Sequence, residues 1–149
     1  MIDVAAGKAS TWRDLEMGGT SDANFSPDGS LFAVANIGGF TQIRESGSRR
    51  LVTTVGHGQY PDDAVNFSPD GSRLVTASEG PDTLTLWDLD GRELLRLQAE
   101  PNQFLSLRFS ADGAWLASIN YYNELDLWRA PSWAEIETAE KAAQSSPEN

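Results

Sequence analysis

The pentapeptide Phe67-Ser68-Pro69-Asp70-Gly71 stands near the middle of the 149-residue chain and is one of three near-identical copies. The other copies occupy residues 25–29 and 109–113, and the third has Ala111 in place of the proline. The phenylalanines Phe25, Phe67 and Phe109 are therefore spaced 42 residues apart in both steps. A constant period of this length is typical of an architecture built from repeated supersecondary units.

Each pentapeptide is predicted to be the turn of a β-hairpin, because proline presets φ and glycine accepts a positive φ. Segments that alternate in polarity like strands follow each turn. The second strands span 31–36, 74–78 and 115–120, the third strands span 40–44, 84–88 and 125–128, and fourth strands span 51–55 and 93–97. With the strand that ends at each phenylalanine, this gives four strands per repeat.

A four-stranded repeat of about 40 to 45 residues is typical of a β-propeller blade. The second repeat resembles the WD40 repeat in the dipeptide Gly56-His57, in Ser78 and in the tripeptide Leu86-Trp87-Asp88. The third repeat has a less conserved form of that tripeptide, Leu127-Trp128-Arg129. The resemblance implies a buried hydrogen-bonded set, made of His57, Ser78, Asp82 and Trp87. Asp82 lies one residue nearer Trp87 than the family spacing expects, so we interpret the blades as degenerate. The corresponding positions of the first and third repeats hold Gly38 and Tyr122.

The expected fold is all-β: a WD40-type β-propeller of about three four-stranded blades plus a half blade at the N-terminus, with a short C-terminal helix. The half blade is expected at 1–19, blades at 20–58 and 59–100, and an incomplete blade at 101–130. A helix is expected at 131–143, because Ser132 and Glu135 form a capping box, and a disordered tail at 144–149. A closed propeller needs about twice as many strands, so another propeller fragment or a homo-oligomer is expected to complete the blades.

The composition disfavours several classes of function. A net charge of −11 makes nucleic acid and anionic membranes poor partners. No stretch has the roughly 20 apolar residues of a membrane span, and no leader is recognisable, so a cytoplasmic location is expected. The chain has no cysteine and a single histidine. We therefore predict no catalytic residues, no metal site and no cofactor.

The remaining candidate for function is the set of loops at one end of the blades. Aromatic and acidic side chains on these loops predict a protein or peptide partner, with a basic one as the hypothesis. The candidate residues are Phe40, Tyr60, Asp62, Asp63, Glu79, Tyr121 and Tyr122. We predict a non-catalytic protein-interaction scaffold. Two alternatives stay open: an accessory propeller domain of a hydrolase or a periplasmic TolB-like protein, and a self-assembling structural unit.

Overall fold

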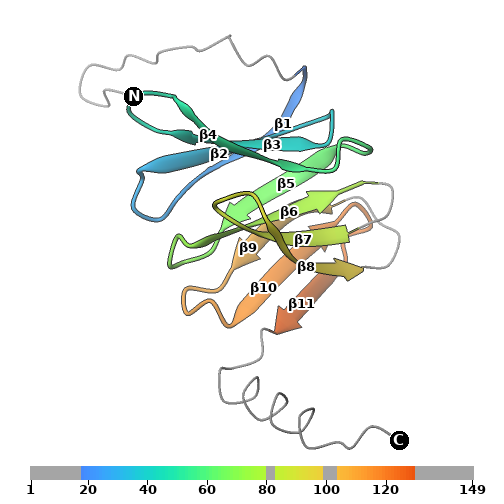
Figure 1. The fold of residues 1–149 in the computed structure, drawn as a ribbon. Helices are drawn as coiled ribbons and strands as arrows, with labels where there is room; N and C mark the ends of the chain where they lie inside the picture. The colour runs from blue at the N-terminus through green and yellow to red at the C-terminus, as the bar shows by residue number, and fades with distance from the viewer. Residues whose placement is uncertain (1–17, 80–82, 99–103, 130–149) are drawn as a thin grey trace, which may run out of the picture.

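The computed structural model describes residues 18–79, 83–98 and 104–129, which form three separate antiparallel β-sheets (Figure 1). Blade 1 contains β1 (Thr20–Phe25), β2 (Leu31–Asn36), β3 (Phe40–Glu45) and β4 (Leu51–Gly56). Blade 2 contains β5 (Asp62–Phe67), β6 (Arg73–Ser78), β7 (Thr83–Asp88) and β8 (Glu93–Gln98). Blade 3 contains β9 (Phe104–Phe109), β10 (Trp115–Asn120) and β11 (Leu125–Arg129).

The prediction of an all-β chain of consecutive three- and four-stranded sheets is confirmed within these ranges. In both four-stranded sheets each strand pairs with its neighbour in sequence, as the repeat predicted. The described strands form an open stack and do not close into a ring (Figure 1). The expected half blade at 1–19, the helix at 131–143 and the tail at 144–149 lie outside the described residues, apart from residues 18 and 19. Across the described ranges, no helix is long and apolar enough to span a membrane.

The three sheets lie face upon face, with blade 2 between blades 1 and 3 (Figure 1). One apolar cluster joins Ala33, Ala35 and Ile43 of blade 1 to residues of blade 2 that include Leu74 and Trp87. A second cluster joins blade 2 to blade 3 through Ala64, Val75, Ala77, Leu84, Phe104, Leu107 and Leu116. Burying one large aliphatic side chain stabilises a fold by about 1.5–3 kcal/mol, so these two clusters hold the stack together.

The first strands of the blades run next to one another and are linked by hydrogen bonds. The Asp22 carboxylate on β1 accepts a bond from the amide of Val65 on β5 at 3.0 Å. One blade further along, the Asn66 side chain on β5 accepts a longer bond, of 3.5 Å, from the amide of Phe109 on β9. These contacts align the blades, so the strand ends of all three lie at common ends of the stack.

The repeated pentapeptides form the turns between the first two strands of each blade. In blade 2, Ser68 donates a hydrogen bond to the Asp70 carboxylate at 2.6 Å, and Gly71 adopts a φ of +70°. The same serine–aspartate bond occurs at 2.6 Å in blade 1 and 2.5 Å in blade 3. A β-carbon on Gly71 would lie 3.6 Å from the Pro27 ring. The turns of neighbouring blades are therefore adjacent at one end of the stack.

Candidate binding site

The hydrogen-bonded set implied by the WD40 resemblance is only partly brought together. The Trp87 indole nitrogen donates to the Thr76 hydroxyl at 3.0 Å, whereas the Ser78 hydroxyl donates to the carboxylate of Asp62 at 2.6 Å. The placement of Ser78 beside Trp87 is therefore wrong, and Thr76 takes that role. The His57 ring packs on Trp87 with centroids 5.3 Å apart and planes tilted by 41°. Asp82 lies outside the described residues.

The strand register explains why Thr76 replaces Ser78. Leu74 pairs with Trp87 across β6 and β7, so Thr76, two residues further along, lies on the same face of the sheet and next to the indole. In blade 3 the Trp128 indole donates to Ser118 at 3.2 Å. Ser118 stands 42 residues after Thr76, so the period of the repeat was the signal that could have identified the correct acceptor.

Asp62 was expected on an exposed acidic loop, and this expectation is wrong. It is the first residue of β5 and is only 1% exposed. Its carboxylate accepts hydrogen bonds from Ser78 at 2.6 Å and from Thr41 of blade 1 at 2.9 Å. Burial raises the pKa of Asp62, while those two hydrogen bonds and the nearby His57 oppose the rise. In the sequence, Asp62 and Asp63 resembled the charges of a solvated loop. The structure instead buries the Asp62 carboxylate, which is hydrogen-bonded to residues of blade 1 and blade 2.

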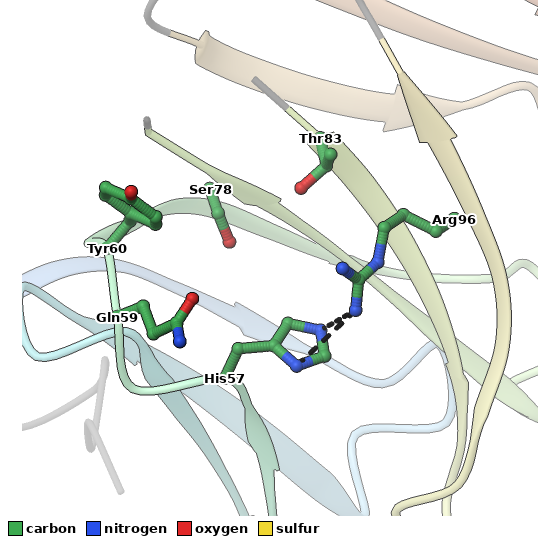
Figure 2. Close-up of a pocket in the computed structure, with 6 residues that line it drawn as sticks. All are labelled: His57, Gln59, Tyr60, Ser78, Thr83 and Arg96. Carbon is green, nitrogen blue, oxygen red and sulfur yellow. Dashed lines mark hydrogen bonds between the residues drawn. The ribbon is translucent and has the colours of Figure 1, made fainter. Parts of the chain in front are cut away.

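A polar pocket of about 170 Å³ opens at the end of blade 2 (Figure 2). His57, Gln59 and Tyr60 line it from the loop between β4 and β5. Ser78 contributes from the end of β6, Thr83 from the start of β7 and Arg96 from the middle of β8. The pocket is thus built from one loop and three strands of a rigid sheet.

An ionic group borders this pocket. Nη2 of Arg96 lies 2.6 Å from Nε2 of His57 and 2.7 Å from the Glu93 carboxylate. The same carboxylate oxygen lies 3.2 Å from Nε2 of His57. Neutral His57 can accept from Arg96 at Nε2, whereas protonated His57 would donate to Glu93 there. The group therefore fixes the positions of both ring and guanidinium.

The pocket contains Ser78, His57 and a neighbouring aspartate, yet their connections differ from those of a nucleophilic triad. Such a triad needs the histidine to accept the serine proton and the carboxylate to orient the histidine. Here the Ser78 hydroxyl bonds directly to Asp62, and Nε2 of His57 contacts Glu93 and Arg96. In the part of the chain that is described, no group of three His, Cys, Asp or Glu side chains could hold a metal ion. The geometry favours binding over acyl-transfer chemistry.

The predicted aromatic loop residues are exposed and lie at the same end of the stack as the pocket. Phe40, Tyr60, Tyr121 and Tyr122 are exposed by 43%, 47%, 65% and 68%. The Phe40 ring lies over Gly58, where an added β-carbon would be 2.4 Å from it. Tyr121 and Tyr122 contact each other edge to face with centroids 6.0 Å apart. Asp63 and Glu79 are half-buried, so they form a smaller acidic surface than predicted.

Comparison with known proteins identifies a repeat that runs from β4 of blade 1 to β7 of blade 2. A family model described as "WD domain, G-beta repeat" matches residues 49–88. A protein from Synechocystis, named as an uncharacterised WD repeat-containing protein, is 40% identical to this chain over 76 residues. That match covers 50% of this chain and 21% of the relative, so the chain spans about a fifth of that protein's length. These matches identify a WD-type repeat at residues 49–88 and support the resemblance of the chain to WD40-repeat proteins.

Proposed function

We propose that this chain is a non-catalytic protein-interaction module whose partner binds at the end of the blades that carries Phe40, Tyr60, Tyr121 and Tyr122. WD40 repeats generally mediate contacts between proteins, and loops held by a rigid sheet are common binding sites. The observation that carries the proposal is the exposure of four aromatic side chains at one end of the stack. Exposed aromatic residues supply a large share of the energy in protein interfaces.

The charge of the chain supports a basic protein or peptide as the partner. Asp63 and Glu79 stand at the same end as the aromatic residues, and the whole chain carries a net charge of −11. A negative field speeds association with a basic partner and weakens with added salt. We propose a cytoplasmic location for this interaction, which subcellular fractionation can test.

The test compares the wild-type chain with the double variant Tyr121→Ala/Tyr122→Ala. Partners recovered from the native host by affinity purification are identified, and their affinity for both chains is then measured with purified components. The double variant should bind at least roughly 10-fold more weakly, as expected when interface anchors are truncated. Because both tyrosines are more than half exposed, the variant should keep the wild-type unfolding midpoint.

Leu94→Ala is the matched control, since Leu94 is 40% exposed but lies near the start of β8, at the opposite end of the blade. It should bind the partner as the wild-type chain does. Equal affinity of the tyrosine variant and the wild-type chain would refute the proposed surface.

A second candidate function is self-assembly through the outer face of blade 3. Ile119 pairs with Leu125 on this face, and Leu125 and Leu127 are 60% and 61% exposed. The corresponding pair in blade 2 is Ala77 with Leu84, and both side chains are buried by blade 3. We infer that another blade, from a second copy or from a longer product, covers the blade 3 face.

Light scattering coupled to size exclusion tests this second candidate. The wild-type chain should elute as a multimer, and Leu125→Glu/Leu127→Glu should be monomeric because carboxylates cannot be buried without partners. Leu51→Glu, at a 41% exposed site on the outer strand of blade 1, is the control and should stay multimeric. A wild-type monomer at all concentrations would exclude self-assembly of this chain.

A further inference from the structure

The pocket at the end of blade 2 contains hydrogen-bonding groups that the fold does not use. Thr83 is only 3% exposed, and its hydroxyl has no hydrogen-bond partner among the described residues. The fully buried polar atoms that lack a partner do not include this oxygen, so the hydroxyl faces the accessible space of the pocket. It is therefore available to a ligand that enters the pocket.

Two more donors reach the same space. The contacts of Arg96 with His57 and Glu93 all use Nη2, so Nη1 and Nε have no partner within the described ranges. Gln59 likewise makes no side-chain hydrogen bond there. Figure 2 shows the Thr83 hydroxyl, the Gln59 amide and the Arg96 guanidinium around one space. The Ser78 hydroxyl is different, since its proton is already donated to Asp62.

We propose that this pocket binds a carboxylate group, held by Arg96, Thr83 and Gln59. A planar guanidinium is a good donor to a carboxylate, and a hydroxyl and an amide complete the hydrogen bonds of that group. The volume of about 170 Å³ admits a carboxylate on a short aliphatic stem. Tyr60 belongs both to the pocket lining and to the proposed interaction surface, but that surface is tested at Tyr121 and Tyr122 of blade 3 and the pocket at Arg96, Thr83 and Gln59, so either proposal can fail without the other.

The local charge of the pocket accommodates an anion even though the chain as a whole is acidic. Glu93 engages one nitrogen of the Arg96 guanidinium and leaves the other two for a ligand. Asp62 bonds to the pocket residue Ser78, and both its carboxylate oxygens are occupied by hydroxyl donors. More distant surface carboxylates are screened over about 10 Å at ordinary salt. The short-range attraction of Arg96 therefore outweighs the net charge.

The test is an NMR titration of the isotopically labelled full chain at pH 7 with three probes. These are acetate, a short terminally blocked peptide with one central glutamate, and the same peptide with glutamine. The amide signals of Gln59, Ser78 and Thr83 should shift and saturate with acetate, the glutamate peptide or both. Saturation by acetate would identify a free small acid as sufficient, and saturation by the glutamate peptide alone would identify a protein side chain as the source.

Variants of the donors check that the pocket is responsible. Arg96→Gln and Thr83→Val should each lower the affinity for the tighter-binding carboxylate probe by at least roughly 10-fold, which is the effect of losing one hydrogen bond to a charged group. Gln59→Ala, like Arg96→Gln at an exposed position, keeps the proposal testable if the buried variant Thr83→Val misfolds. Arg92→Gln is the control, because Arg92 lies on the same blade but pairs with Asp88 away from the pocket. No saturation with either carboxylate, equal binding of the glutamine peptide, or unchanged affinity of the variants would overturn the proposal.

Discussion

The indole nitrogen of Trp87 donates a hydrogen bond to the hydroxyl of Thr76 across the β6–β7 pair at 3.0 Å. Both side chains are almost completely buried on the face of blade 2 that packs against blade 1. Trp128 and Ser118 repeat the arrangement in blade 3 at 3.2 Å. The large indole ring is therefore buried while its N–H group keeps a hydrogen-bond acceptor.

Replacing Thr76 with valine should destabilise the chain by about 1–3 kcal/mol, because the buried indole N–H loses its acceptor. Thr85→Val is the matched control: Thr85 is equally buried and directly opposite, but its hydroxyl makes no hydrogen bond within the described residues. Urea unfolding followed by Trp fluorescence measures both changes. If the two variants lose the same stability, the hydrogen bond contributes nothing specific.

Replacing Gly71 with alanine should cost about 1–2 kcal/mol, because its φ of +70° lies in the left-handed region that a β-carbon disfavours. Space does not limit this substitution, since the nearest atom is 3.6 Å from the new carbon. Gly47→Ala is the control, with an open surrounding and no positive φ, and should change the unfolding free energy by less than about 0.5 kcal/mol. Thermal unfolding measures the stability of both variants. An equal loss of stability in the two would show that backbone strain at position 71 contributes nothing.

Removing the charge of Asp70 should lower the free energy of unfolding at neutral pH but not in strong acid. The Ser68 hydroxyl, followed by the amide and hydroxyl of Ser72, lowers the pKa of Asp70 from 3.8 to about 2. A lowered folded-state pKa stabilises the fold above pH 3.8, and this stabilisation is lost as the pH falls toward 2. Because the side chain is largely exposed, Asp70→Asn should lose less than about 1 kcal/mol at pH 7. Urea titrations at pH 7 and pH 2 should show the difference shrinking; a constant difference would contradict the assignment.

The buried carboxyl of Asp62 should give the opposite pH dependence. Burial raises its folded-state pKa above 3.8, so the folded state binds its proton more tightly than the unfolded state. Its contribution is most favourable below pH 3.8 and is lost as the pH rises through the folded-state pKa. Asp62→Asn should remove that decline, so the variant gains stability relative to the wild-type chain as the pH rises. A difference between the two chains that stays flat from pH 3 to pH 8 would show that Asp62 is not buried as described.

The period of the sequence predicted most of the fold, because one motif recurs with the same physical role. Ser26, Ser68 and Ser110 each bind the aspartate two residues later, so three turns could be read from one pattern. Strand order and the all-β class followed from those turns. Each of these turn bonds joins residues two positions apart in the sequence, so the turns could be predicted without knowing how the blades pack.

The candidate site could be predicted only in part, because its details depend on contacts between blades. Asp62 is buried because Thr41 of blade 1 and Ser78 of blade 2 both reach it, and neither is near it in sequence. The position that Asp62 occupies at the start of β5 is filled in β9 by the apolar Phe104. Exposed tyrosines were easier to identify, since the residues next to a turn stay accessible whatever the neighbouring blade presents.

The most direct test of the stacked-blade arrangement is a map of NOEs between methyl groups and aromatic rings in the full chain. Ala33, Ala35 and Ile43 of blade 1 should show NOEs to the side chains of Val65, Leu74 and Trp87 of blade 2. Ala77 and Leu84 of blade 2 should show NOEs to Leu107 and Leu116 of blade 3. Cross-strand NOEs that join β4 to β5 in one continuous sheet, with no NOEs between the two sets of buried side chains, would contradict the account.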